Sequence, residues 1–325
     1  MKLPAILSFT FTIMAPRSLG MATALCGLGL TAADAAIIIA SGRNLSNPDY
    51  APGAYYYSID TDTGIATPIS PLLPANGANG LSASGSQLVG FHNGAHGIGD
   101  PVTGSFTPIG TGNGLTLPGY EVLGGAGYGV PTSGDDRRLQ RIDLTTSIST
   151  GLGIGNPIGA AMDVFYGDPE GTNNPNILAL GSVGDTLYGM NTGTGKYNLV
   201  ALDAATGGAT IIGAANALAT SGTPGARYDG FSSLTGVDED GDGVYDTLYG
   251  NINFYDPDGL TGPLPQEQFG GIIRFDLNDG TWDLIGANPG VIFFGFGSTT
   301  IPEPGAAALA ATLGFGSILR RRRQG

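Results

Sequence analysis

The chain has 325 residues, of which 41% are hydrophobic and only 12% are charged, and its formal net charge at pH 7 is −14. This composition supplies enough apolar material for a folded core and argues against disorder caused by high charge. Residues 36–300 hold 25 of the 27 acidic residues but only 7 of the 13 basic ones, so nucleic-acid binding is not expected, because phosphate contacts need clustered Lys and Arg.

The N-terminal residues 1–36 have the order of a secretory signal peptide. Two basic residues precede an apolar run from Met21 to Leu30, and Ala33-Asp34-Ala35 forms an A-x-A cleavage pattern. We therefore expect this segment to direct export through the Sec machinery and then to be removed. The single cysteine, Cys26, would leave with it, so disulfides and thiol nucleophiles are not expected in the mature chain.

A repeated unit runs through residues 37–300. In each copy an apolar residue and an Asp precede a turn, often with Thr-Gly, and then a β-rich stretch, as in "SIDTDTGIATPIS" and "ALDAATGGATIIG". The Asp can accept backbone N–H groups within the turn, and the Gly supplies the left-handed conformation that returns the chain to a strand. The repeated positions are Asp60, Asp100, Asp143, Asp203 and Asp276.

These aspartates are 40, 43, 60 and 73 residues apart, which indicates the repeated sheets, or blades, of a β-propeller. The first two spacings match a four-stranded propeller blade, which takes about 40 to 50 residues, and the longer two indicate insertions or an extra blade. The pentapeptide Asp-Thr-Leu-Tyr-Gly also occurs twice, from Asp185 and from Asp246. We expect an all-β fold that resembles the β-propeller superfamily, with five four-stranded blades or alternatively six. A β-sandwich and a β-solenoid remain open alternatives.

The two ends of this domain predict how the ring closes. Ile37 begins inside what would be the second strand of a blade, and "VIFFGFGS", from Val291, resembles a first strand. Pairing these two segments would complete the first blade and remove its open edge. We therefore predict a closed ring.

The segment "DEDGDGVYD" places acidic residues at alternate positions of a tight loop. Such residues converge on one side and form an oxygen cage for a hard cation, with Gly243 at the sharp bend. The segment resembles the calcium loop D-x-D-x-D-G-x-x-D of integrin-type propellers and departs from the EF-hand, because Tyr249 stands at position twelve. One structural Ca²⁺ is therefore predicted. Its expected ligands are Asp238, Asp240, Asp242, the carbonyl group of Val244, and Asp246.

Two other groups of residues are interpreted without a catalytic role. His92 and His96 are four residues apart, but the glycines around them argue against a helix, so we expect a polar loop and no zinc site. We interpret Tyr55, Tyr56 and Tyr57 mainly as core residues. Their alternation along a strand nevertheless predicts that at least one of them points outward, where it would offer a weak sugar-stacking surface.

The C-terminal segment "IPEPGAAALAATLGFGSILRRRRQG" combines a Pro-Glu-Pro motif, an apolar stretch and a basic end. As a helix, Gly305 to Leu319 would span roughly 22 Å, which makes a short transmembrane segment for a hydrocarbon core about 30 Å thick. The arginines would stay in the cytoplasm by the positive-inside rule. The motif residues are Pro302, Glu303, Pro304, Arg320, Arg321, Arg322 and Arg323.

These three ordered parts resemble the PEP-CTERM sorting signal of Gram-negative bacteria. The resemblance implies transient anchoring in the inner membrane, processing near the PEP motif by an exosortase, and delivery to the cell surface or to an exopolysaccharide matrix. Without this resemblance, the hydropathy of the C-terminal segment alone would predict the alternative, a secreted domain anchored in the membrane by its tail. The expected organisation is a signal peptide over residues 1–36, a propeller-like domain over 37–300 and a sorting signal over 301–325.

We therefore expect an exported, non-enzymatic protein that binds or scaffolds. Its expected partners are the Sec machinery and an exosortase during export, and then an exopolysaccharide or another surface protein. The alternative is an extracellular polysaccharide hydrolase or lyase that uses carboxylates in the funnel of the propeller. A glycosidase of that kind would need two carboxylates about 5 to 9.5 Å apart.

Overall fold

The part of the chain that the computed structural model describes lies within residues 37–299. The chain divides into two units, Met1–Ala32 and Ala33–Gly325, and every described residue belongs to the second. The predicted signal peptide, sorting signal and transmembrane helix therefore lie outside the described residues. The described ranges are 37–73, 80–84, 87–112, 114–131, 138–152, 177–191, 198–214, 227–240, 243–255 and 268–299.

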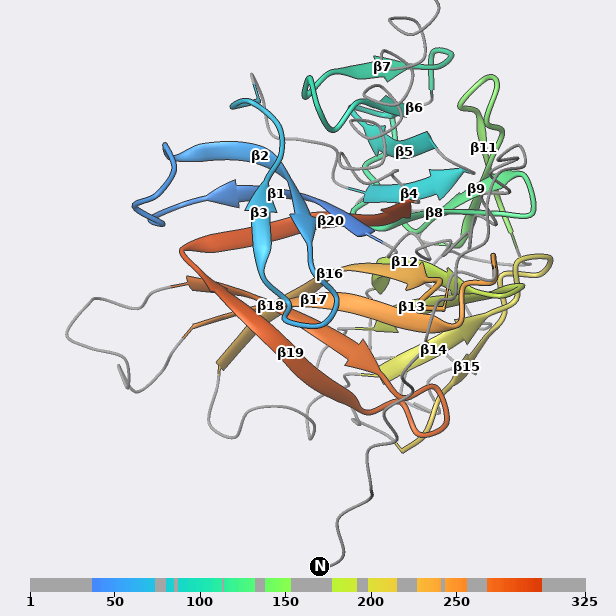
Figure 1. Cartoon of the computed structure of the whole chain (residues 1–325). Helices are drawn as coiled ribbons and strands as arrows, with labels where there is room; N and C mark the ends of the chain where they lie inside the picture. Colours follow the sequence, from blue (N-terminus) through green and yellow to red (C-terminus); the bar gives the residue numbers. More distant parts are fainter. Residues whose placement is uncertain are drawn as a thin grey trace, which may run out of the picture. The chain divides into compact units, whose positions relative to one another are not determined.

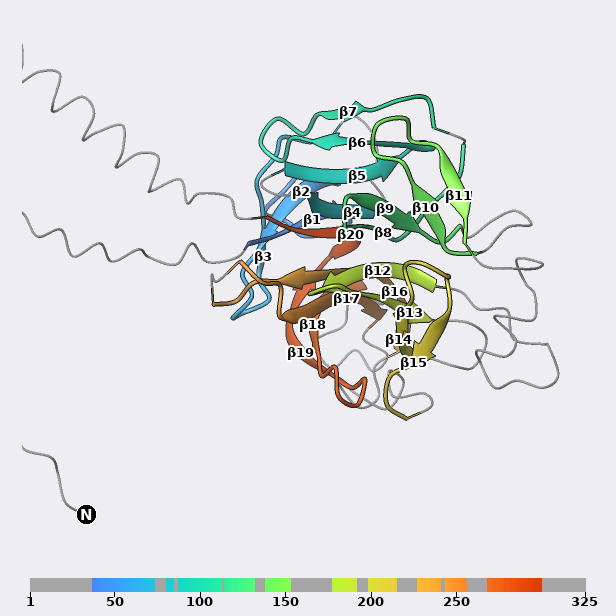
Figure 2. The same cartoon turned by 90° about the vertical axis from the view of Figure 1, so that its right-hand side faces the viewer.

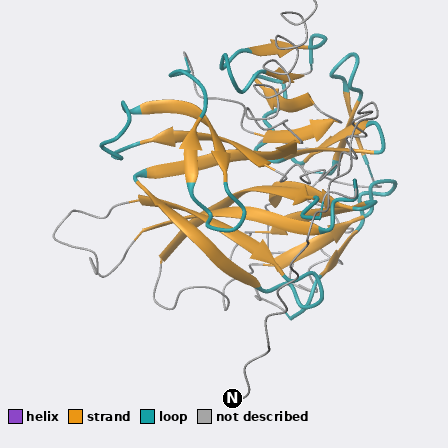
Figure 3. Ribbon diagram, viewed as in Figure 1, coloured by secondary structure: helices purple, strands orange, loops and turns teal. Residues whose placement is uncertain are grey.

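These residues form strands, turns and loops, as Figure 3 shows, and none of them belongs to a helix that is long and apolar enough to cross a membrane. Twenty strands form five antiparallel sheets of four strands, and each sheet is one blade. This agrees with the absence of a sustained helical period in the sequence.

Each blade runs from an innermost strand, named first, to an outermost strand, named last. Blade 1 contains β20 (Val291–Thr299), β1 (Ile37–Asn44), β2 (Gly53–Ile59) and β3 (Ala66–Pro68). Blade 2 contains β4 (Gly80–Ser84), β5 (Gln87–His92), β6 (Ala95–Gly99) and β7 (Phe106–Pro108). Blade 3 contains β8 (Tyr120–Leu123), β9 (Ala126–Gly129), β10 (Gln140–Ile142) and β11 (Ser149–Gly151). Blade 4 contains β12 (Ile177–Val183), β13 (Thr186–Asn191), β14 (Asn198–Leu202) and β15 (Ala209–Ile211). Blade 5 contains β16 (Arg227–Val237), β17 (Thr247–Tyr255), β18 (Gln268–Phe275) and β19 (Trp282–Pro289).

The five sheets close into a ring. Their inner strands contact one another in the order β20, β4, β8, β12, β16 and back to β20, and Figure 1 and Figure 2 show the blades arranged in this order. The fold is therefore a five-bladed β-propeller. The prediction of five blades is confirmed, and the alternatives of six blades, a sandwich or a solenoid are wrong.

Strand β20 completes blade 1 from the far end of the domain. It pairs antiparallel with β1, so that Ile37 lies opposite Thr299 and Asn44 lies opposite Val291. The side chain of Phe293 on β20 is fully buried and packs edge to face on Tyr57, with ring centroids 5.7 Å apart. The predicted closure is therefore confirmed, and β1 is paired on both sides, with β2 and with β20.

The repeated Asp begins a turn between the third and fourth strands of each blade. In blade 4, the N–H of Asp203 donates to the carbonyl of Gly208, and the carbonyl of Asp203 accepts the N–H of Gly207. The Asp203 carboxylate also accepts the N–H groups of Ala205 and Thr206, at 2.8 and 3.2 Å. Because the same backbone pair occurs in all five blades, the turn is a structural repeat.

The last residue of each turn has a left-handed backbone and lies against the preceding blade. These residues are Gly64, Gly104, Ser147, Gly207 and Gly280, with φ between 62° and 73°. At Gly280 in blade 5, an added Cβ would overlap the carbonyl oxygen of Ile212 at the end of blade 4. The turns therefore also fix how neighbouring blades pack.

The longer spacings between repeated aspartates reflect insertions, because no sixth sheet is present among the described residues. Residues 153–176 lie between β11 and β12, and they are outside the described part of the chain. The two Asp-Thr-Leu-Tyr-Gly pentapeptides occupy equivalent places, at the starts of β13 and β17, the second strands of blades 4 and 5.

Two predictions about exposed side chains are wrong. Tyr55, Tyr56 and Tyr57 are all buried, because Tyr56 packs on one side of β2 with residues of blade 2, while Tyr55 and Tyr57 pack on the other side with residues of blade 5. His92 and His96 lie in β5 and β6 and not in a polar loop. His96 is buried, and its Nδ1 lies 2.7 Å from the hydroxyl of Tyr120.

Candidate functional site

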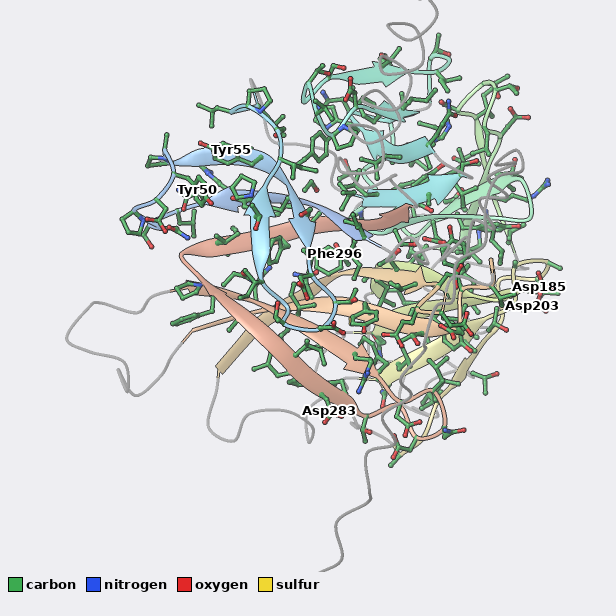
Figure 4. The ribbon with its side chains drawn as sticks, viewed as in Figure 1. Tyr50, Tyr55, Asp185, Asp203, Asp283 and Phe296 are labelled. Atoms are coloured by element: carbon green, nitrogen blue, oxygen red, sulfur yellow. The ribbon has the colours of Figure 1, made fainter. Side chains whose placement is uncertain are left out.

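One end of the ring carries the repeated Asp turns. Because neighbouring strands run antiparallel, the turn after the first strand and the turn after the third strand lie at the same end of a blade. Figure 4 labels Asp185 and Asp203, from these two turns of blade 4, at that same end. We call it the Asp-turn face. The inner turns of blades 3, 4 and 5 meet there around one pocket, which Gly124, Gly184 and Tyr245 help to line.

The predicted calcium loop connects β16 to β17 on the Asp-turn face. Asp238 is buried, and its Oδ2 accepts the N–H of Gly243 at 2.8 Å. Gly243 is the sixth residue of the loop and has a φ of +91°. At the end of the loop, the N–H of Asp246 donates to the carbonyl of Val237 at 3.0 Å. The backbone therefore has the sharp bend that a calcium loop needs at its sixth position.

The predicted ligands are only partly placed. Asp238 is buried, Asp240, Val244 and Asp246 are exposed, and Asp242 lies outside the described residues. Among the described residues, no group of three or more Asp, Glu, His or Cys side chains is arranged to hold a metal ion. The predicted donors are all oxygen atoms, as Ca²⁺ prefers. The described donors are of the kind that Ca²⁺ binds, and Asp242 would supply the remaining carboxylate of the predicted set.

A second site lies on the axis of the ring, and the sequence analysis missed it. Each of the five inner strands contributes a buried polar side chain to this site, and we call these residues the axial ring. Its members are Ser82, Glu121, Ser182, Thr235 and Ser298, each at most 6% exposed. Four of them carry a hydroxyl group, and Glu121 carries a carboxylate.

Hydrogen bonds connect the axial ring across blade boundaries. The hydroxyl of Ser182 donates to Oε1 of Glu121 at 2.6 Å. The backbone N–H of Ser298 donates to Oγ1 of Thr235 at 3.0 Å. At Gly236 on β16, an added Cβ would overlap the carbonyl oxygen of Ser182 on β12. The glycine therefore allows these two inner strands to approach closely.

The environment of Glu121 disfavours its charged form. Its side chain is 5% exposed, and Oε2 is buried with no hydrogen-bond partner. Burial raises the pKa of the Glu121 carboxyl to about 8, and the nearby hydroxyl groups of Ser182 and Ser82 oppose this rise. A carboxyl with a perturbed pKa beside a pocket is a candidate functional group.

The pocket beside Glu121 has a volume of about 110 Å³. Residues from all five blades line it, including Glu121, Ser182, Thr235, Tyr245 and Ser298. No Lys, Arg or His is among the described residues of this lining. The pocket therefore supplies Glu121 with hydroxyl groups but with no positively charged side chain.

Tyr245 joins the calcium loop to the axial ring. Its hydroxyl forms a hydrogen bond with Ser298, and its backbone carbonyl accepts the N–H of Gly184 at 2.9 Å. Burial raises the pKa of Tyr245, and the negative charges of Glu121 and Asp238 raise it further. The two candidate sites are therefore electrostatic neighbours on the Asp-turn face.

A weak sequence signal for Glu121 does exist. It is the one charged residue in the apolar stretch "YEVL", which forms β8. Its partner Ser182 is 61 residues away in another blade, so no local motif connects the two. Only the convergence of the inner strands brings them together.

Comparison with protein-family models and with curated proteins gives no match. Similar solved structures include a quinonprotein alcohol dehydrogenase-like protein from Bacteroides thetaiotaomicron, with a TM-score of 0.35 and 9% identity over 83% of this chain and 69% of that one. Puromycin hydrolase gives a TM-score of 0.35 and 12% identity over 77% of this chain and 47% of its own. A protein from Lactobacillus plantarum gives 0.36 and 13% over 81% of this chain and 99% of its own. Likenesses of this degree carry no inference about function.

Proposed function

We propose that this chain is an exported, non-enzymatic β-propeller that binds or scaffolds at the cell surface or in the exopolysaccharide matrix of a Gram-negative bacterium. The axial pocket carries the non-enzymatic part of the proposal, because Glu121 is the one carboxylate among its described lining residues. Glycoside hydrolysis generally uses two carboxylates about 5 to 9.5 Å apart. The pocket volume of about 110 Å³ is also small for a sugar substrate.

The export part of the proposal rests on the two ends of the sequence. Residues 1–36 would direct the chain to the Sec machinery, and the PEP motif with Arg320 to Arg323 would direct it to an exosortase. All twenty described strands lie between Ile37 and Thr299, and β20 pairs with β1. Removal of both predicted signals would therefore leave every described strand of the propeller in place, as processing at both ends requires.

The proposal includes one structural Ca²⁺ in the loop from Asp238 to Asp246. The carboxylates of Asp238, Asp240, Asp242 and Asp246, with the carbonyl of Val244, would hold it. When bound, the ion would neutralise the clustered carboxylates and fix the connection between β16 and β17. Because Tyr245 in the same loop lines the axial pocket, an ordered loop would also hold one wall of that pocket.

The export proposal is tested by expressing the full chain in a Gram-negative host that has an exosortase, and in a matched strain without it. Mass spectrometry of the surface fraction should find a chain that begins after Ala35 or Ala36 and ends near Pro304. In the strain without exosortase, and in a variant with both Pro302→Ala and Pro304→Ala, the chain should accumulate in the inner membrane. An intact chain of 325 residues in the cytoplasm would contradict the proposal.

The non-enzymatic proposal is tested with the purified wild-type protein and exopolysaccharide from the same host. We expect the protein to sediment with the polysaccharide and to release no new reducing or unsaturated ends. Release of such ends, with loss of that activity in Glu121→Gln, would favour the hydrolase or lyase alternative.

The calcium loop offers a matched pair of variants. Asp246 and Asp185 each precede an identical Thr-Leu-Tyr-Gly strand, but only Asp246 lies in the predicted loop. Titration calorimetry of chelator-treated protein should show about one Ca²⁺ per chain. Asp246→Ala should weaken this binding at least tenfold, while Asp185→Ala should leave it unchanged. Absence of Ca²⁺ binding to the wild type would overturn the calcium site without affecting the export proposal.

A further inference from the structure

The buried carboxylate of Glu121 has one oxygen that the protein does not satisfy. Oε1 accepts the hydroxyl of Ser182 at 2.6 Å, whereas Oε2 is buried without a hydrogen-bond partner. Buried polar groups in folded proteins are almost always paired with protein, water or an ion. Protonation of Oε2 would not remove the need for a partner, because the new hydroxyl hydrogen would itself need an acceptor. An additional group in the adjacent pocket would satisfy Oε2.

The size of the pocket limits what this group can be. A volume of about 110 Å³ holds a few water-sized particles, since one water molecule takes about 30 Å³ of liquid volume. A sugar ring or a nucleotide does not fit in this space. The space therefore suits water molecules and a small ion, and it excludes an organic ligand of this size.

The chemistry of the lining indicates a hard cation. The side-chain donors are the carboxylate of Glu121 and the hydroxyls of Ser182, Thr235, Tyr245 and Ser298, all of which are oxygen ligands. Oxygen ligands select hard cations such as alkali and alkaline-earth metals over softer ones. The ionised carboxylate of Glu121 would repel a negative group, so the ionised pocket favours a cation over an anion.

The charge of the lining favours a monovalent ion. Glu121 is the one carboxylate among the described lining residues, so a single positive charge neutralises the pocket. A divalent ion would leave an uncompensated positive charge in a buried site, which is costly. The raised pKa of the Glu121 carboxyl also agrees with a site that lacks a counter-charge when it is empty.

We propose that the axial pocket binds one alkali-metal cation, held by the carboxylate of Glu121 and by hydroxyl groups of the axial ring and Tyr245. This ion would bridge inner strands of several blades at the point where the ring closes. The site shares Tyr245 with the predicted calcium loop, but its other donors lie outside that loop. It does not depend on the proposed function of the chain.

The test is thermal and urea unfolding of the full propeller at pH 8 in chelator, as NaCl or KCl replaces choline chloride at constant ionic strength. An ion that binds only the folded state raises the folding equilibrium constant about tenfold for each tenfold increase in its concentration above Kd. We expect this rise with Na⁺ or K⁺ and not with choline. Chelator keeps the calcium loop out of the measurement.

Glu121→Gln keeps the size of the side chain but removes its charge, and it should abolish the response to alkali cations. Glu239→Gln is the matched control, because Glu239 is an exposed carboxylate on the same face and accepts a hydrogen bond from Thr247 at 3.0 Å. It should respond like the wild type. If Glu121→Gln does not fold, Ser182→Ala replaces it and should shift the titration to higher salt.

Three results would overturn the proposal. The first is a wild-type stability that is the same in choline, Na⁺ and K⁺. The second is an equal response of the wild type and of the folded axial variant. The third, measured in a parallel titration without chelator, is a response to Ca²⁺ alone that the axial variant abolishes, which would make the site divalent.

Discussion

The hydroxyl of Ser147 in blade 3 accepts the backbone N–H of His96 in blade 2 at 3.0 Å. The same hydroxyl donates to the carbonyl of Ile109, which follows the outer strand of blade 2. Ser147 has a φ of +62°, at the turn position that is Gly in the other four blades. The serine thus gains two contacts between blades at a backbone position that favours glycine.

We predict that Ser147→Ala is more destabilising than Ser147→Gly, by about 1 kcal/mol. Both variants leave the buried N–H of His96 without its partner, which costs about 1–3 kcal/mol. Only the glycine variant also relieves the left-handed backbone. Urea unfolding with an unchanged m value measures both effects.

Ser105→Ala is the control for this pair, because Ser105 is exposed in the corresponding turn of blade 2. A change within about 0.5 kcal/mol is expected for it. A Ser147→Gly variant that is more stable than the wild type would show that the two contacts between blades contribute little.

The Asp turns predict a loss of stability in acid. Hydrogen bonds from the side chain and backbone of Thr145 and from the backbone of Thr146 lower the pKa of Asp143 from 3.8 to about 2. The folded state therefore favours the carboxylate, and its stabilisation is present above pH 3.8 and is lost as the pH falls through about 2. Asp143→Asn keeps an acceptor oxygen but does not titrate.

Melting temperatures of the wild type and of Asp143→Asn, measured between pH 7 and pH 2, check this prediction. The wild type should be the more stable of the two at pH 7, and the difference should shrink below pH 4. A difference that stays constant over the whole range would show that the turn does not favour the charged form.

Glu121 predicts the opposite dependence on pH when alkali cations are absent. Its pKa is raised from 4.5 to about 8, mainly by burial. The contribution of this group to stability is therefore fully present below pH 4.5 and is lost as the pH rises through about 8. The free energy of unfolding should fall by up to about 1.4 kcal/mol per pH unit within that interval.

Urea unfolding in choline buffers between pH 5 and pH 9 measures this dependence. Glu121→Gln should lack it, because an amide does not titrate in this range. Tyr245, which shares the pocket, has a raised pKa and stays neutral over this interval. If the free energies of unfolding of the wild type and the variant change with pH in parallel, Glu121 does not ionise between pH 5 and pH 9.

The closing strand predicts where the chain can be shortened. A chain that ends at residue 300 keeps β20 and should melt like the full propeller, whereas a chain that ends at residue 290 loses it and should not unfold cooperatively.

Within β20, Phe296 is fully buried, so Phe296→Ala should lower the free energy of unfolding by about 3–5 kcal/mol.

Circular dichroism and urea unfolding of these chains give the result. Ile292→Ala is the control within the same strand, because Ile292 is only partly buried and should cost less. Cooperative unfolding of the chain that ends at residue 290 would mean that four blades and an incomplete fifth fold without closure.

Local sequence patterns were enough to predict the blade count and the closure of the ring. Each repeated Asp forms its turn with residues two to five positions ahead, as Asp203 does with Ala205 and Gly208, so the turn is encoded locally. Five such turns indicated five blades, and the incomplete strand sets at Ile37 and Val291 indicated the closure. In the calcium loop, the bend at Gly243 and its hydrogen bond to Asp238 are local in the same way.

Tertiary contacts, in contrast, set which side chains are buried and what lies on the axis. Tyr55, Tyr56 and Tyr57 alternate along β2 as a strand requires, yet all three are buried, because blades pack on both faces of the sheet. Glu121 is buried because five inner strands converge, and its partner Ser182 comes from another blade. Burial and pKa depend on all the neighbours of a group in space, and the pocket beside Glu121 is lined by residues from every blade.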